Sequence, residues 1–233
     1  MTMLIAAAVF FLALHLLVAG TRLRGAITGA IGEGPYMGLF SLASLGGIVW
    51  LAMSYNAASA EGSDMLWSLG PGVSHAGIIV VATAFWLGVS GLLTPNPTSV
   101  GQQSAASKEV TGILRVTRHP FLWGVAIWSA FHMAANGDAA SVVFFGTFLL
   151  LAVAGTFSID GKRARSMGDA WSGFAQRTSN IPFGAILTGR NTLKLAEVFG
   201  FRQLIALVVF AAVLFVHAWA FGVSPFPGGW VPF

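Results

Sequence analysis

Six long apolar stretches constrain the fold of this chain more than any other feature of its sequence. They run from Met3 to Gly20, Tyr36 to Tyr55, Gly72 to Leu93, Pro120 to Ala135, Ala139 to Ser158 and Gln203 to Phe221. In a lipid bilayer every backbone amide must find its hydrogen-bond partner within the chain, so an apolar stretch of about 20 residues predicts a spanning helix. We therefore predict an all-α polytopic membrane protein, a bundle of six transmembrane helices that forms a single domain over residues 1–233.

The composition agrees with a membrane protein and excludes several kinds of site. Only 9% of the residues are charged and the mean hydropathy is +0.79, whereas a soluble domain carries roughly 25% charged residues. The chain has no cysteine, which excludes disulfides, iron–sulfur clusters, thiolate zinc sites and a cysteine nucleophile. Five histidines remain as the natural ligands for a transition metal.

The basic residues predict the orientation of the chain in the membrane. All 12 lysines and arginines fall in alternate connections, namely those after the first, third and fifth apolar stretches. Because positive residues mark the cytoplasmic connections, we expect both termini on the outer, periplasmic side. The net charge of +4 then reflects membrane topology, and we expect the lipid bilayer rather than a nucleic acid as the partner of this chain.

Two of these cytoplasmic connections are long enough to carry structure. Residues 94–108 are rich in Pro, Asn, Ser, Thr, Gln and Gly, which predicts a solvated loop. Residues 160–202 mix charged and apolar side chains, and Trp171 and Phe174 lie one helical turn apart. This pattern predicts a short cytoplasmic amphipathic helix on the inner membrane surface.

Three histidines fall inside apolar stretches at similar depth. At about 1.5 Å of rise per residue, His15 lies about 18 Å below the outer face, and His132 and His217 lie about 20 Å above the inner face. In a hydrocarbon core about 30 Å thick these positions lie in the middle third. Since an ionisable side chain there is costly, we interpret the three as functional and expect two of them to clamp one cofactor.

The nature of the ligands favours haem over other metal centres. Zinc prefers four N, O or S ligands, and few carboxylates lie in the apolar stretches. Haem needs only one or two protein ligands, and its apolar body suits a membrane interior. A haem held by two of the three histidines His15, His132 and His217 is therefore the metal site that needs fewest other residues. The alternative without a metal is that each histidine donates a hydrogen bond to a neighbouring helix.

Other side chains near these histidines are candidates for binding a cofactor. Trp128 and Ser129 share a helix face with His132, so Ser129 is expected to orient the imidazole. For Trp128, ordinary packing in the protein interior is favoured over a stacking role. Arg118 and His119 precede a proline at a helix start, where two cations beside free amides favour an anion such as a haem propionate, a phosphate or a carboxylate. His119 lies about 20 Å from His132 along one helix, so the two cannot share a site.

Several motifs, in order along the chain, together resemble the NnrU family. They are His15 with Arg22 and Arg24, Ile31–Tyr36, Gly112–Pro120, Trp128 with His132, Asn136-Gly137 and Arg177–Phe183. That family is similar to plant zeta-carotene isomerase, an integral membrane haem b protein that changes a cis double bond in a carotenoid precursor. Bacterial members are associated with denitrification, in the expression or assembly of nitrite and nitric oxide reductases.

The resemblance implies a site, a location and a set of partners. His15 and His132 match the haem-ligand positions of the plant enzyme, whereas Ser129 stands where the plant pattern has a cysteine, so ligand exchange with a thiolate is not expected. The implied location is the bacterial inner membrane. The implied partners are an apolar polyene or a diatomic gas, together with a redox or assembly partner.

Two other classes of function remain open from the sequence. Residues 118–124, with Asp160–Gly168, Trp171–Phe174 and Arg177, also resemble membrane methyltransferases that use S-adenosylmethionine, although Asp160 stands alone where those enzymes have paired acids. A membrane scaffold without any cofactor is the third possibility.

Overall fold

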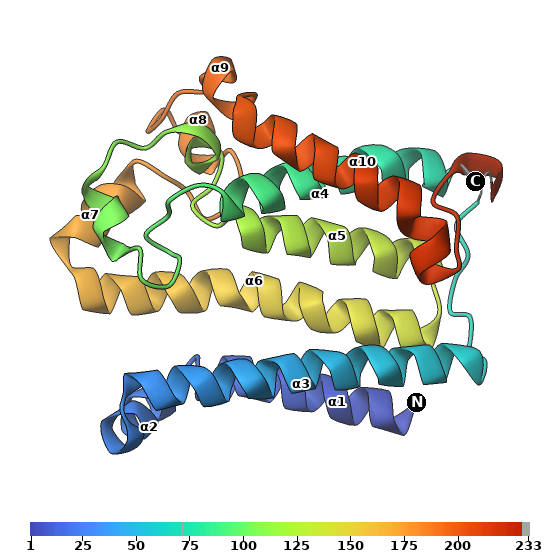
Figure 1. The fold of residues 1–233 in the computed structure, drawn as a ribbon. Coiled ribbons are helices and arrows are strands. Elements are labelled where there is room, and N and C mark those ends of the chain that lie inside the picture. The colour runs from blue at the N-terminus through green and yellow to red at the C-terminus, as the bar shows by residue number, and fades with distance from the viewer. Residues whose placement is uncertain (71, 230–233) are drawn as a thin grey trace.

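The computed structural model describes residues 1–70 and 72–229, and its regular elements are helices (Figure 1). The long helices are α1 (Thr2–Ala13), α3 (Glu33–Ala60), α4 (Val73–Leu92), α5 (Pro120–Asn136), α6 (Ala139–Met167) and α10 (Phe201–Phe221). The short ones are α2 (Leu23–Ile31), α7 (Asp169–Gln176), α8 (Gly184–Leu187) and α9 (Leu195–Val198). A π-helical turn, η1 (Leu14–Val18), continues α1, and short 3₁₀ turns lie at Gln103–Ser107, Gly112–Arg115 and Pro227–Gly229. The all-α class predicted from the sequence is confirmed.

The helices have the lengths and composition of a polytopic membrane protein. Four of them, α3, α4, α6 and α10, are each long and apolar enough to cross a bilayer. The helix formed by α1 and η1 adds a fifth when counted with α2, from which it is bent by 78°. The remaining predicted span corresponds to α5, which has 17 residues.

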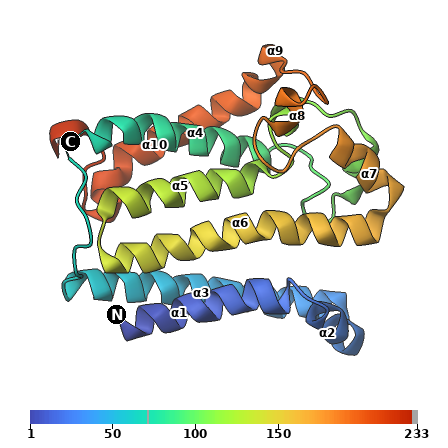
Figure 2. The same cartoon turned by 180° about the vertical axis from the view of Figure 1, so that it is seen from behind.

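The long helices pack as a bundle with α6 in the middle. Figures 1 and 2 show α1 and α3 on one side of α6 and α4, α5 and α10 on the other. The described N-terminus and the C-terminal segment lie at the same end of the bundle, and α2, α7, α8 and α9 lie at the opposite end. A chain that enters and leaves at one end is what an even number of crossings requires.

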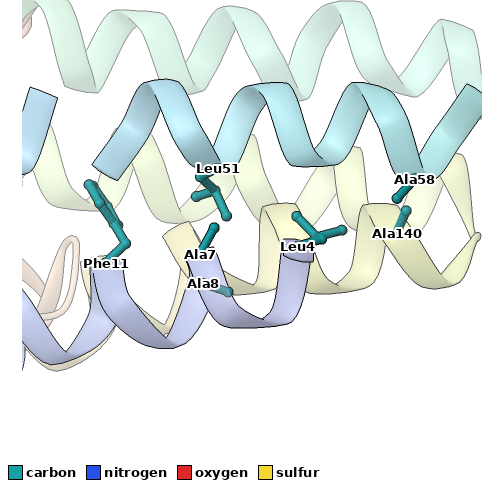
Figure 3. Close-up of a cluster of buried hydrophobic side chains, with 7 residues drawn as sticks. All are labelled: Leu4, Ala7, Ala8, Phe11, Leu51, Ala58 and Ala140. Atoms are coloured by element: carbon teal, nitrogen blue, oxygen red, sulfur yellow. The ribbon is translucent and has the colours of Figure 1, made fainter. Parts of the chain in front are cut away.

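Small side chains let α1, α3 and α6 pack closely (Figure 3). The buried cluster that joins them consists of Leu4, Ala7, Ala8, Phe11, Leu51, Ala58 and Ala140. Apolar lipid gives helices no hydrophobic reason to associate, so close van der Waals contact between small residues becomes the main attraction. This packing fixes the end of α1, and therefore the position of His15 one turn later.

Glycine lets the backbones of α4 and α5 come close together. A Cβ placed on Gly124 of α5 would lie 2.6 Å from the carbonyl oxygen of Ala84 and 2.7 Å from the amide of Gly88, both on α4. Only a residue without a side chain allows this distance. The pair α4 and α5 is thereby held in register beneath α10.

The two connecting segments are more closely packed than their composition predicts. The amphipathic helix is present as α7, but Trp171 and Phe174 pack on Ala106, Val110 and Leu114, so protein rather than lipid covers its apolar face. Residues 94–108 form the predicted loop, which is exposed over residues 100–104, but Thr94 and Asn96 at its start are buried and the loop contains the 3₁₀ turn Gln103–Ser107. The side-chain amide of Asn96 donates to the carbonyl of Arg118 at 2.9 Å. Polar residues in this loop therefore make hydrogen bonds within the protein.

Replacement of Gly124 by alanine tests the α4–α5 contact. We expect Gly124→Ala to destabilise the protein by about 1–3 kcal/mol, because the new methyl group must push two backbones apart. Gly88→Ala is the matched control, since its Cβ would meet only the Cα of Gly124, at 3.9 Å. Thermal unfolding in detergent, followed by circular dichroism, measures both. Equal melting temperatures for the two variants would contradict the packing described here.

Candidate functional site

His15 lies in a π-helical turn at the end of the first long helix. Its Nδ1 donates to the carbonyl of Phe11 at 2.8 Å, and its Nε2 lies 3.2 Å from the hydroxyl of Ser44 on α3. Because a carbonyl can only accept, the one proton of a neutral imidazole here sits on Nδ1, and Nε2 keeps its lone pair. This is the tautomer of a metal-ligating histidine, whose second nitrogen is usually fixed by a backbone carbonyl. Single π-helical turns of this kind are frequent at functional sites.

His15 lines a cavity of about 1020 Å³. Its lining changes from apolar to basic, and we call it the basic cavity. The apolar part includes Leu16, Phe40, Phe121, Leu122, Leu151 and Gly155, and the basic part includes Arg24, Lys162, Arg163 and Arg165. A cavity of this size reaches the upper end of the range typical of small-molecule and cofactor sites.

His132 lines a second, smaller cavity. Its Nδ1 donates to the carbonyl of Trp128 at 2.8 Å, so it has the same tautomer as His15. The ring stacks on Phe145 with centroids 5.1 Å apart, and its Nε2 makes no hydrogen bond within residues 1–70 and 72–229. The cavity has a volume of about 230 Å³ and is also lined by His217 and Asn136; we call it the His132 cavity.

The structure brings His132 and His217 to one cavity and places His15 in another. Aromatic rings lie between the two sites. Phe148 of α6 contacts Phe11 beside His15 and Trp128 beside His132, with ring centroids 5.9 Å apart in both cases. His217 has its Nδ1 bonded to the carbonyl of Val223 at 2.8 Å, so all three histidines keep Nε2 as the unprotonated nitrogen.

The structure places Trp128 among aromatic rings and bonds Ser129 to its own helix. Trp128 packs in the aromatic cluster against Phe145, with ring centroids 5.2 Å apart. The hydroxyl of Ser129 is buried and donates to the carbonyls of Val125 and Ala126, at 2.7 and 3.2 Å. The predicted hydrogen bond from Ser129 to His132 is therefore wrong, because a helical serine reaches the carbonyl of the preceding turn more easily.

Arg118 and His119 do attract an anion, and that anion belongs to the chain. Arg118 donates to Asp160 of α6 through Nε at 2.9 Å and through a terminal nitrogen, while His119 Nε2 lies 2.7 Å from the same carboxylate. Asn180 donates to it as well, at 3.1 Å. Burial lowers the pKa of His119 although Asp160 opposes the shift, so the ring is neutral and Nε2–H donates. These side chains therefore hold α5 to α6 and do not face either cavity.

The same centre joins two segments that lie far apart in the sequence. The amide of Arg118 donates to the carbonyl of Ser179 at 2.9 Å, and the indole of Trp123 donates to the carbonyl of Asn180 at 2.8 Å. The amide of Phe183 donates to Val116 at 2.7 Å. Residues 112–120 and 177–183 thus bind each other. Sequence reasoning missed Asp160 as their shared partner, although a lone acid just after an apolar stretch was a usable signal.

A second ion pair supports this end of the bundle. The side chain of Arg115 is 6% exposed, and its Nε donates at 2.7 Å to Glu197, which lies in α9. This hydrogen bond, aided by the amide of Gly112, holds the pKa of Glu197 at about 2. Stability from this pair is complete above the ordinary glutamate range and is lost as the pH falls towards 2.

No cluster of three or more His, Asp and Glu side chains in the described part of the chain could hold a metal ion. Within that part, the protein's own side chains do not form the three- or four-ligand arrangement typical of zinc. A site that used a porphyrin would need only one or two of these histidines.

Comparison with known families decides the classification. The family model described as NnrU protein matches residues 3–225, which is nearly the whole chain. The chain belongs to the NnrU family. This match favours NnrU over the methyltransferase alternative, whose best-matching residues, Arg118 and His119, are bonded to Asp160.

Two curated plant proteins are similar to this NnrU-family chain. The 15-cis-zeta-carotene isomerase, chloroplastic, of Arabidopsis thaliana is 30% identical over 173 residues, which cover 70% of the chain and 45% of the plant protein. The protein of the same description from Zea mays is 34% identical over 83 residues, which cover 36% of the chain and 23% of the plant protein. The chain therefore spans less than half the length of these relatives. No solved structure matched it significantly.

Removal of the Asp160 charge tests the role of this carboxylate. We expect Asp160→Asn to cost about 3–5 kcal/mol of stability, because Arg118 would then be a largely buried cation without a counter-ion. Glu109→Gln is the control, since Glu109 is 74% exposed and an exposed pair contributes at most about 1 kcal/mol. Unfolding temperatures of the purified variants in detergent compare them. The assignment fails if Asp160→Asn is as stable as Glu109→Gln.

Proposed function

We propose that this NnrU-family membrane protein binds haem b in the basic cavity with His15 as an axial ligand. The observation that carries the proposal is the combination of an Nε2 lone pair on His15 with a large cavity whose lining changes along α6 from Leu151 and Gly155 to Lys162 and Arg163. Haem has the matching character, with an apolar macrocycle and two acidic propionates. Its iron needs only one or two ligands from the protein.

The second axial ligand in this proposal is His132, with His217 as the alternative. Support for His132 comes from its Nε2, which makes no hydrogen bond within the described residues, and from the Trp128 carbonyl that fixes its ring. His132 lines the other cavity, so a haem shared with His15 requires the contact between Phe148 and Trp128 to open. If Phe148 and Trp128 stay in contact, His15 is the one axial ligand that the protein provides.

The residues of the basic cavity have separable tasks in this proposal. Phe11 and Phe40 pack on the His15 ring, and Ser44 donates to Nε2 when no metal is bound there. The apolar wall excludes water, and the basic side chains favour acidic groups. Haem bound in such a site would supply a redox-active iron able to carry an electron, bind a diatomic gas or engage a double bond.

A polyene isomerase is the second candidate, favoured by the similarity to 15-cis-zeta-carotene isomerase. An apolar polyene would enter from the membrane and lie along the apolar wall of the basic cavity. The role in denitrification implied by the family, in the expression or assembly of nitrite and nitric oxide reductases, is compatible with the same haem site. The isomerase function differs from the role in denitrification because it requires a polyene as substrate.

We further propose that six helical segments cross the bacterial inner membrane, with both termini outside. Support comes from the 12 basic residues in alternate connections and from the two chain ends at one end of the bundle (Figure 1). In this arrangement the π-helical turn at His15 and the 17-residue α5 are the two segments that depart from a regular long span.

Optical spectroscopy of the purified protein tests the haem proposal. We expect the wild type, produced with ample haem supply, to show the Soret band of a low-spin b-type haem. His15→Ala should lose this low-spin spectrum, and added imidazole should restore it. His75→Ala is the control, because His75 is exposed and lines neither cavity.

The same spectra decide the second ligand. Loss of the low-spin spectrum in His132→Ala but not in His217→Ala supports His132, and the reverse supports His217. A colourless wild type that is monodisperse by size-exclusion chromatography would contradict haem binding and would favour the scaffold without a cofactor. Size-exclusion profiles of every variant show that a spectral change is not a folding failure.

Single-cysteine labelling tests the orientation, and the absence of native cysteine makes the background silent. We expect Glu61→Cys to react with a membrane-impermeant maleimide in intact spheroplasts, because Glu61 follows α3 on the outer side in this topology. Ser107→Cys, next to Lys108, should react only after the cells are lysed. Both positions are exposed, so accessibility differs only through the membrane. The opposite labelling pattern would reverse the proposed topology.

A further inference from the structure

The basic cavity holds more positive charge than its acidic side chains neutralise. Glu33 is the acidic residue of its lining, and it already pairs with Arg24. Lys162, Arg163 and Arg165 make no ion pair within residues 1–70 and 72–229. The cavity therefore carries three positive charges that have no counter-ion in the described part of the chain.

Lys162 is the most informative of these cations. Its side chain is half-buried and donates to the carbonyl of Ala19 at 3.0 Å, just after the π-helical turn. An ammonium group has three donors, so others remain for a further partner. Because a partly buried charge without a counter-ion costs free energy, an anion placed there would be favoured.

Tyr36 supplies an independent sign of a missing acceptor. This residue lines the basic cavity and is 4% exposed, yet its hydroxyl is buried and has no hydrogen-bond partner among the described residues. The guanidinium of Arg24 lies over its ring at 5.4 Å. Orphaned buried hydroxyls are rare because they cost stability, and a bound group that accepts from them is one explanation.

Another part of the cavity lining, further towards the start of α6, suits an apolar body. Phe40, Leu151 and Gly155 lie there, and the small Gly155 leaves space beside Leu122, whose nearest atom would be 3.4 Å from an added Cβ. A molecule that fills the cavity would thus contact hydrocarbon at one end and cations at the other.

We propose that the basic cavity binds an amphipathic anion. Its carboxylate or phosphate lies against Lys162 and Arg165 and accepts a hydrogen bond from Tyr36, and its apolar body lies along Phe40 and Leu151. This inference deepens the proposed function, and the identification of the ligand as a porphyrin rests on that function. Two sources offer this chemistry, the propionates of a porphyrin and the phosphate of an anionic phospholipid.

Metal-free protoporphyrin IX separates this site from ligation of iron. It carries two carboxylates but no metal, and its dimethyl ester carries no charge. Fluorescence titration of the purified full-length protein in neutral detergent measures binding of both. We expect Lys162→Gln, which keeps a donor for Ala19, to weaken protoporphyrin binding by about tenfold or more. Lys162→Arg should bind as the wild type does, and so should His15→Ala.

Two further variants sharpen the test. Tyr36→Phe removes a hydroxyl that has no partner to lose, so it should leave the melting temperature unchanged or higher while weakening protoporphyrin binding severalfold. Lys108→Gln removes the same charge from an exposed position outside the cavity and should have no effect. The dimethyl ester should bind the wild type and every variant alike.

Lipid titration identifies the other source. If the ligand is a phospholipid, micelles containing phosphatidylglycerol will raise the melting temperature of the wild type above its value in phosphatidylcholine. They will not raise the melting temperature of Lys162→Gln. They will also displace protoporphyrin from the wild type. The proposal is overturned if protoporphyrin and its ester bind equally and the two lipids act alike. It is also overturned if Lys108→Gln weakens binding as much as Lys162→Gln. Loss of the haem spectrum in His15→Ala with unchanged protoporphyrin binding supports both proposals, and a colourless wild type that still binds protoporphyrin contradicts only haem ligation.

Discussion

A neutral imidazole inside an apolar bundle must place its single N–H donor on an acceptor, and His15 places it on the carbonyl of Phe11. That hydrogen bond leaves Nε2 as the basic nitrogen and aligns the ring with the π-helical turn. The close packing of α1 against α3 and α6 holds the carbonyl in place (Figure 3). The functional account depends on this arrangement, because a ring with the other tautomer would present a proton where a ligand atom is needed.

Two groups of charged side chains have different roles at the end of the bundle that carries α2 and α7. At one, Asp160 neutralises Arg118 and bonds His119, which joins α5, α6 and the segment after α7. At the other, Lys162, Arg163 and Arg165 line the basic cavity and have no counter-ion within residues 1–70 and 72–229. Both lie on or next to α6, so the sequence Asp160-Gly-Lys162 separates a satisfied structural carboxylate from an unsatisfied lysine. The first fixes the fold, and the second leaves attraction available for a ligand.

The sequence predicts the fold more completely than the site. Apolar stretches with helix-breaking ends predicted the long helices, because in lipid the backbone has few alternatives to a helix. The depth of each histidine was also predictable from the rise per residue. The depth of a residue does not give the direction in which its side chain points around the helix axis. The sequence therefore could not show that Phe148 and Trp128 separate His15 from His132. For the same reason the partner of Arg118 was missed, since that bond depends on which neighbouring helix the side chain meets. The bonds of Ser129 were missed for a different reason, because they go to the preceding turn of its own helix.

An experimental structure of the haem-loaded protein, with anomalous scattering recorded at the iron edge, tests the central claim most directly. The account predicts one iron peak bonded to Nε2 of His15, with the macrocycle in the basic cavity and its carboxylates towards Lys162. Iron found only between His132 and His217, or a fully loaded protein with no iron at His15, would contradict it.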